Sequence, residues 1–93
     1  MYEIVFTSKS KRDLKRLKKR NITDFNLVSN LINILFDFGL DGVPEKLKPH
    51  PLKENYKGTF ECHVKPDLLV IWLQIDALNK IHIIRVGSHS DLF

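Results

Sequence analysis

Hydrophobic and polar positions follow a strand-like period near both ends of the chain. Residues 2–7 (YEIVFT) alternate and are rich in β-forming residue types, which predicts a strand. Residues 59–65 (TFECHVK) alternate in the same way, and residues 81–86 (IHIIRV) predict the last strand. Between them, residues 68–75 (LLVIWLQI) form an unbroken apolar run, which predicts a central strand covered on both faces.

Two helices are predicted after the first strand. Ser8 or Ser10 can cap the first helix, in which Leu14 and Leu17 form a narrow apolar stripe and which ends near Asn21.

Thr23 or Asp24 is expected to cap the second helix, which Gly39 closes. Apolar side chains occupy many of its positions, namely 27, 28, 31, 32, 34, 35, 36 and 38. A face this broad is typical of a helix that is buried on more than one side. We therefore expect the sheet to cover one side and the first helix or a partner chain to cover the rest.

The remaining segments predict loops and turns. Residues 40–58 contain Pro44, Pro49, Pro51 and Gly58 and few periodic apolar positions, so we expect a loop there. Short turns are expected at Pro66-Asp67 and at residues 76–80 (DALNK). The order β-α-α-β-β-β predicts a single domain, residues 1–93, of the α+β class. In it, two helices pack on one face of a mainly antiparallel four-stranded sheet.

Composition restricts the class of protein further. No stretch approaches the roughly 20 apolar residues of a membrane span, so we expect no membrane contact. The first residues lack the charged leader and small-residue cleavage site of a signal peptide. The one cysteine, Cys62, has no intrachain disulfide partner, and the expected compartment is the cytoplasm.

Positive charge is concentrated in the first predicted helix. The net charge is +4, and residues 9–20 hold eight of the fifteen lysines and arginines with only one acid. Such a block favours binding of nucleic acid or of an acidic partner. The alternative is a solvated helix face. That alternative is preferred for a charge cluster that has no chemical site beside it.

Candidate chemical groups lie at strand ends and in turns. Strand alternation puts Cys62 on the core side and Glu61 and His63 on the opposite side. Asp67 follows in the turn. Antiparallel pairing of three successive strands can bring the end of the last strand, with Arg85, beside these groups.

His89 lies four residues beyond Arg85 and is expected in the same place. Metal-free RNA cleavage needs a base for the ribose 2′-OH, an acid for the leaving 5′ oxygen and a cation for the charged phosphorane. Histidine suits both proton transfers near neutral pH. Arginine grips phosphate through two hydrogen bonds, and an aromatic such as Phe93 can stack on a base.

Simpler interpretations exist for each of these residues. Asp67 after a proline is typical of turns, Arg85 can pair with Glu61 across the sheet, and Phe93 can close the core. A zinc site formed by Cys62, His63, His50 and His89 is a further alternative. It is discounted because adjacent strand residues such as 62 and 63 point to opposite faces and no pair has ligand-like spacing.

Two longer stretches, KPHPLKENYKGTFECHVKPDLLVIW and IIRVGSHSDLF, together with the basic first helix, resemble the YafQ branch of the RelE/ParE toxin superfamily. The family pattern is a His-Pro-Leu loop, a strand ending in His-x-x-Pro-Asp, and a Gly-x-His near a C-terminal Leu-Phe. Here these elements are His50 to Leu52, His63 to Asp67, and Gly87 to Phe93.

The resemblance implies the toxin of a type II toxin–antitoxin system that cuts mRNA in the ribosomal A site. Cleavage would proceed by 2′-OH attack to a 2′,3′-cyclic phosphate, with no metal or other cofactor. Carried over by position, the catalytic set is His50, His63, Asp67 and His89, with Arg85 stabilising the phosphate and Phe93 positioning the mRNA. We expect His89 to be the general acid, Asp67 or His63 the base, and His50 a supporting group. Glu61 is a second-tier candidate.

The chain departs from some relatives at Leu68, where they carry tryptophan, so its grip on mRNA can differ. The resemblance assigns the basic helix to ribosomal RNA or to a cognate antitoxin with an acidic C-terminal tail. The residues in question are Lys9, Lys11, Arg12, Lys15, Arg16, Lys18 and Lys19. Operator DNA is expected as a partner only of the toxin–antitoxin complex.

Two other functions compete with the nuclease. A ParE-like binding toxin would inhibit a protein such as DNA gyrase without cutting RNA, but ParE-like relatives lack the histidine set. A purely regulatory partner would bind DNA only with its antitoxin, and the basic first helix permits this.

Overall fold

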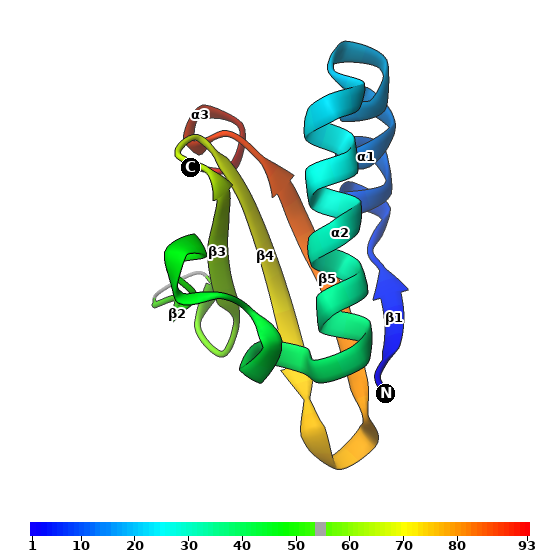
Figure 1. The fold of residues 1–93 in the computed structure, drawn as a ribbon, viewed down its shortest axis with the longest axis vertical. Coiled ribbons are helices and arrows are strands. Elements are labelled where there is room, and N and C mark those ends of the chain that lie inside the picture. The colour runs from blue at the N-terminus through cyan, green and yellow to red at the C-terminus, as the bar shows by residue number, and fades with distance from the viewer. Residues whose placement is uncertain (54–55) are drawn as a thin grey trace.

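The fold is a five-stranded sheet with two long helices on one face (Figure 1). The computed structural model describes residues 1–53 and 56–93. The strands are β1 (Glu3–Phe6), β2 (His50–Pro51), β3 (Phe60–Lys65), β4 (Leu68–Ile75) and β5 (Lys80–Gly87). The helices are α1 (Ser8–Arg20), α2 (Ile22–Phe38) and α3 (His89–Leu92), with short 3₁₀ helices η1 (Gly39–Gly42), η2 (Glu45–Leu47) and η4 (Asp76–Leu78).

The strand order β1-β5-β4-β3-β2 makes the sheet mixed, because β1 runs parallel to β5 while the other neighbours are antiparallel. The predicted α+β class is confirmed. The strand count of four was wrong, because β2 lies inside the segment 40–58 that was predicted as a loop. The same segment contains η2 and most of η1. Residues 54 and 55 of that segment lie outside the described residues.

The helix caps lie slightly earlier than the sequence suggested. The Thr7 hydroxyl accepts a hydrogen bond from the Ser10 amide at 3.1 Å and caps α1. The Asn21 side chain accepts one from the Asp24 amide at 3.1 Å and caps α2. The predicted caps, Ser8 or Ser10 and Thr23 or Asp24, were wrong. Asn21 has an extended backbone and is flanked by helix on both sides, so one residue ends α1 and starts α2.

The main core lies between the helix pair and the sheet. Leu31 and Leu35 of α2 pack with Trp72 of β4 and Ile83 of β5, all essentially inaccessible to solvent. The expected cover of α2 by the sheet on one side and by α1 on another is found. The apolar side chains Leu27, Phe36 and Phe38 of α2 are nevertheless exposed, because α1 packs beside α2 and leaves the outer side of α2 uncovered (Figure 1). No helix in the described ranges is long and apolar enough to cross a bilayer.

A second, smaller apolar cluster lies on the opposite face of the sheet. Leu69 and Ile71 of β4 pack there with Leu92 of α3. The Ser88 side chain accepts from the Asp91 amide, and the Asp91 carboxylate accepts from the Ser88 amide, which is a capping box. The C-terminus is therefore a short helix docked on the sheet, and its end residues have defined positions.

Candidate active site

Three ionisable side chains converge on the face of the sheet opposite α1 and α2. His50 on β2 pairs with Glu61 on β3, and His63 lies two residues further along β3 on the same face. The Glu61 Oε1 atom is 3.2 Å from His50 Nε2 and 3.5 Å from His63 Nε2. The Glu61 side chain is only 6% exposed. A buried carboxylate thus lies between two imidazoles.

Backbone carbonyls fix the orientation of both rings. The Nδ1 atom of His50 is 2.7 Å from the Lys48 oxygen, and that of His63 is 3.3 Å from the Pro66 oxygen. A carbonyl only accepts hydrogen bonds, so each Nδ1 is the donor and carries a proton. Each Nε2 is then the nitrogen that can take up or release a proton beside Glu61.

His50, Glu61 and His63 also have the donor atoms of a metal site. One ligand atom from each lies within 4.8 Å of the others. Two imidazoles and a carboxylate suit Zn²⁺ or Cu²⁺, and bonds from Nδ1 to a carbonyl are the usual way of orienting such ligands. The discounted zinc set does not assemble, because Cys62 faces the core, where burial raises the pKa of its thiol to about 12. The sequence analysis did not consider Glu61 as a metal ligand.

His89 and Asp67 form a second hydrogen-bonded unit. Asp67 Oδ1 accepts from His89 Nδ1 at 2.8 Å and from the His89 backbone amide at 3.0 Å. These two bonds, the backbone bond first, hold the pKa of the Asp67 carboxyl below its usual value. The expected proximity of the two residues is therefore found. The bond at Nδ1 leaves His89 Nε2 as the free ring nitrogen.

The three imidazoles form a row. The ring centres of His50 and His63 are 6.0 Å apart, and those of His63 and His89 are 5.7 Å apart. The row thus runs from β2 across β3 to the start of α3.

Arg85 is held by an acid from α1. Its Nε and terminal nitrogen donate to the two oxygens of Asp13 at 2.8 and 3.2 Å. The same carboxylate accepts from the Val86 backbone amide at 3.0 Å. The hydrogen bond to Asp13 is the main cause that raises the pKa of Arg85, and the hydroxyl of Tyr56 contributes less. The alternative that Arg85 pairs with Glu61 was wrong.

The strand geometry explains why Arg85 reaches α1. Ile71 pairs with Arg85 but Trp72 pairs with Ile83, so Ile84 is an extra residue and β5 is bulged at this point. β1 pairs with β5 only as far as Ile83, which leaves the amide of Val86 without a strand partner. Asp13 supplies that partner and binds the guanidinium with the same side chain. β3 has a comparable irregularity between His63 and Lys65.

Phe93 lies beside the histidine row rather than in the core. It is 64% exposed, so the alternative that it closes the core was wrong. Its ring meets Tyr56 edge-on with centres 5.6 Å apart, and its centre is 6.4 Å from that of His89. An exposed ring next to a polar cluster is free to stack on a planar group.

The predicted residues thus fall into linked groups. His50, Glu61 and His63 form one, Asp67 and His89 a second, while Arg85 and Phe93 both lie next to Tyr56. Sequence reasoning missed Tyr56 and Asp13. Asp13 had a detectable signal in the sequence, since it is the one acid in the basic segment 9–20.

Comparison with known proteins places these groups in a family. Residues 2–93 match the family described as bacterial toxin of type II toxin-antitoxin system, YafQ. The mRNA interferase toxin YafQ of Escherichia coli K12 is 32% identical over 91 residues, which cover 98% of this chain and 95% of that protein.

Solved structures agree with this match. YafQ in the E. coli DinJ-YafQ complex is 30% identical with a TM-score of 0.87, covering 100% of this chain and 99% of that one. A metal-bound toxin from Helicobacter pylori is 36% identical with a TM-score of 0.86 over 100% of both chains. The chain therefore belongs to the YafQ family of bacterial toxins of type II toxin–antitoxin systems.

Proposed function

We propose that this chain is a ribosome-dependent endoribonuclease that cuts mRNA in the ribosomal A site. The observation that carries the proposal is the row of three imidazoles, with ring centres 6.0 and 5.7 Å apart. Phe93 lies next to His89, and Arg85 lies two strands from Glu61 in the same row of the sheet. Groups for taking a proton, giving a proton, binding phosphate and stacking a base are then all present around one place.

His89 is the general acid of this proposal. Asp67 accepts a hydrogen bond from His89 Nδ1, which leaves Nε2 to face the substrate. The lowered pKa of Asp67 means that its carboxylate binds a proton more weakly than an ordinary carboxylate does, so it is poorly suited to be the base. Asp67 instead stabilises the protonated form of His89.

His63 is then the base. Its Nδ1 is tied to the Pro66 carbonyl, and its Nε2 accepts the 2′-OH proton with Glu61 beside it to stabilise the resulting charge. The 2′ oxygen attacks phosphorus, the bond to the 5′ oxygen breaks, and His89 Nε2 gives that oxygen its proton. The products are a 2′,3′-cyclic phosphate and a 5′-hydroxyl. His50 supports Glu61 from the other side.

Arg85 and Phe93 position the substrate. The guanidinium carries a permanent charge suited to the phosphorane, and its orientation is set by Asp13. Phe93 stacks on a base and aligns the strand for in-line attack. No step of this proposed reaction uses a metal ion bound by this chain.

A cognate antitoxin is the proposed partner, since YafQ and DinJ are found together in a crystallised E. coli complex. The chain would act in the cytoplasm on ribosomes, as one domain, and would meet operator DNA only together with its antitoxin. Part of the basic helix would contact ribosomal RNA.

The alternative is a ParE-like toxin that inhibits a protein target without cutting RNA. Such a protein needs no row of imidazoles with fixed tautomers, which is why the nuclease is preferred.

Primer extension on a translating mRNA tests the choice. Wild-type protein should give cuts that require the ribosome and fall in register with codons. These cuts should vanish with His89→Ala and persist with His82→Ala, because His82 lies on β5 away from the row. Halted protein synthesis with intact mRNA would favour the binding toxin instead.

A further inference from the structure

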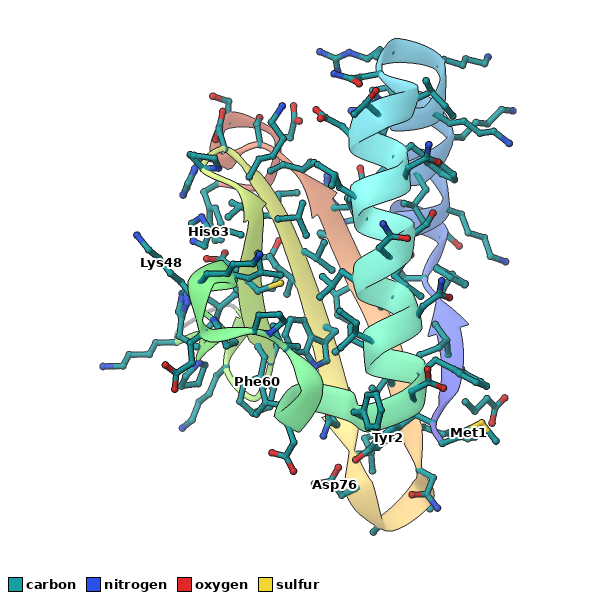
Figure 2. The ribbon with its side chains drawn as sticks, viewed as in Figure 1. Met1, Tyr2, Lys48, Phe60, His63 and Asp76 are labelled. Carbon is teal, nitrogen blue, oxygen red and sulfur yellow. The ribbon has the colours of Figure 1, made fainter. Side chains whose placement is uncertain are left out.

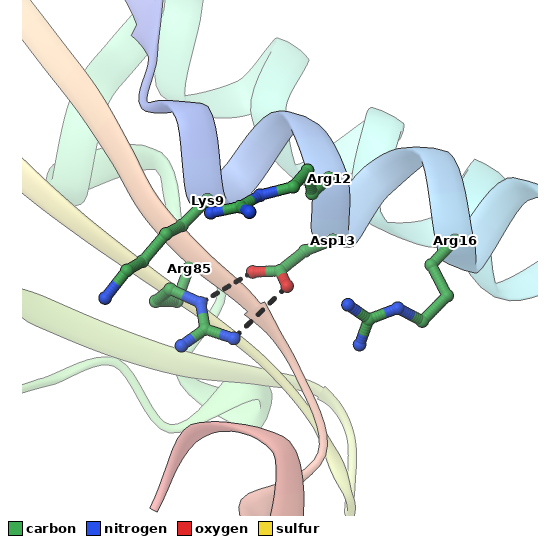
Figure 3. A pocket seen from close by; sticks show the side chains of 5 residues that line it. All are labelled: Lys9, Arg12, Asp13, Arg16 and Arg85. Carbon is green, nitrogen blue, oxygen red and sulfur yellow. Dashed lines mark hydrogen bonds and ion pairs between the residues drawn. The ribbon is translucent and has the colours of Figure 1, made fainter.

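A pocket of about 180 Å³ lies between α1 and β5 and is lined mainly by cations. Its lining residues are Lys9, Arg12, Asp13, Arg16 and Arg85. Figure 3 shows the α1 side chains standing around the bonded pair of Asp13 and Arg85. We call this the α1 pocket.

The charge of the α1 pocket is not balanced within the described residues. Asp13 is occupied by Arg85 and by the amide of Val86. Among residues 1–53 and 56–93, none of the cations Lys9, Arg12 and Arg16 forms an ion pair. Three positive charges around one concave site attract an anion.

A second basic pocket, of about 440 Å³, lies between η2 and the end of β3 and is lined in part by Lys46, Lys48 and His63. Figure 2 shows Lys48 and His63 on the same flank of the molecule. Lys65 also lines it but is paired with Asp24 at 3.0 Å, whereas Lys46 and Lys48 form no ion pair with any described residue. We call this the η2 pocket.

Each pocket contains one residue of the proposed active site. Arg85 lines the α1 pocket and His63 lines the η2 pocket. The strand register places Glu61, Ile71 and Arg85 in one row across β3, β4 and β5. Arg85, at one end of this row, lines the α1 pocket, and His63, two residues from Glu61 on β3, lines the η2 pocket. We call the line that joins the two pockets across β3, β4 and β5 the track.

We propose that the mRNA strand follows this track, with one backbone phosphate in the α1 pocket and another in the η2 pocket, on either side of the scissile phosphate. The inference rests on the proposed nuclease function and adds the path of the substrate. A single-stranded nucleic acid carries a charge at every nucleotide, so it can fill both pockets and still present a phosphate between them. An acidic peptide could also bind the cations, but its binding would not explain why each pocket includes a residue of the proposed active site.

The pocket divides the basic helix into two sets. Lys9, Arg12 and Arg16 recur at helical spacing on the side that faces β5. Lys11 and Lys15 are exposed on the same helix and line neither pocket. Arg12 with Arg16, and Lys11 with Lys15, are both i, i+4 pairs, so they provide variants matched in charge and spacing.

The test is fluorescence anisotropy with a labelled 2′-O-methyl RNA hexamer, which binds as a single strand but lacks the 2′-OH needed for cleavage. Full-length wild type is compared with Arg12→Gln/Arg16→Gln, Lys46→Gln/Lys48→Gln and the control Lys11→Gln/Lys15→Gln over a series of salt concentrations. Thermal melting of each variant confirms that it is folded.

Each pocket variant should bind roughly tenfold more weakly than wild type. Each lost phosphate contact should also reduce the salt slope by about 0.7. The control variant should bind RNA about twofold more weakly than wild type, with little change in the salt dependence of binding. Equal losses in pocket and control variants, or no binding by wild type, would overturn the proposal.

Two further outcomes separate this inference from the nuclease. If RNA binding depends on the pockets but mRNA stays intact in the ribosomal assay, the proposed RNA path holds and the proposed nuclease activity is rejected. Pocket variants that bind RNA normally but escape neutralisation by the cognate antitoxin would assign the α1 pocket to an acidic peptide and overturn the RNA path.

Discussion

The two faces of the sheet differ in what covers them and in the residues they carry. On one face, α1 and α2 bury a continuous core that includes Trp72 and Ile83, which have no solvent exposure. On the other, the buried apolar residues within ranges 1–53 and 56–93 form a small cluster of Leu69, Ile71 and Leu92, beside which the charged and aromatic groups of the site lie.

The face covered by α1 and α2 therefore provides most of the stability, while the open face carries the chemically active groups. The helix-covered face contributes most of the buried apolar area, which is the main favourable term in folding. The open face can therefore hold a buried carboxylate between two imidazoles and an exposed aromatic ring without collapsing the fold. Two strand irregularities, beside His63 and beside Arg85, occur where the site needs side chains redirected.

The largest expected effect is on the covered face. Trp72→Ala should lower the free energy of unfolding by about 3–5 kcal/mol, because it removes a fully buried ring and leaves a cavity. Urea denaturation measures this. Leu78→Ala is the control, since Leu78 is largely exposed and should cost little. A small loss for Trp72→Ala would contradict the assignment of stability to this face.

On the open face, His89→Gln should reduce mRNA cleavage about 100- to 10,000-fold while the urea midpoint stays near that of wild type. The side chain loses its acid function, but it makes no contribution to either apolar cluster. Initial rates of cleavage in a purified translation system provide the measurement. His82→Gln serves as the matched histidine control and should retain activity.

Asp13→Asn should affect both faces, because Asp13 links α1 to Arg85 and Val86. We expect a loss of about 1–3 kcal/mol in the free energy of unfolding, since a charge-assisted pair in a mostly buried place becomes a weaker contact. Cleavage should slow as well, because Arg85 loses its fixed orientation. Asp37→Asn, an exposed acid on α2, is the control for both measurements. Wild-type cleavage by Asp13→Asn would exclude a positioning role.

The smallest expected effect concerns Asp67. Its pKa in the folded protein is lowered, first by the His89 amide and then by the His89 ring, below the ordinary value of about 3.9. A lowered pKa means that the stabilising contribution is present above pH of about 3.9 and is lost as pH falls through the folded value. Because Asp67 is 67% exposed, the contribution is small.

An NMR titration of the Asp67 carboxyl carbon tests this. The midpoint should lie below about 3.9 in wild type and rise in His89→Ala. The rise should be partial, because the backbone amide at residue 89 remains as a donor. A midpoint unchanged by the substitution would show that the ring bond has no influence.

Much of the fold could be predicted because its signals are local. Period-2 alternation in residues 59–65 and the apolar run 68–75 predicted β3 and β4 within one residue at each end. The expected antiparallel order of three successive strands also predicted that Asp67 and His89 lie close together, and the structure shows a hydrogen bond between them. The exposure of Phe38 was not predictable in this way, because it depends on where α1 packs rather than on the pattern of α2 itself.

The chain by itself determined the strand and helix types and the family, and the chemistry of the candidate residues, because periodicity and side-chain identity are properties of short stretches. The tertiary structure decided which groups meet. The bond between Asp13 and Arg85 joins residues 72 positions apart, and it depends on a bulge in β5 and on the end of β1. A bulge is one extra residue in a pairing between distant segments, so it has no signature in the pattern of either segment alone.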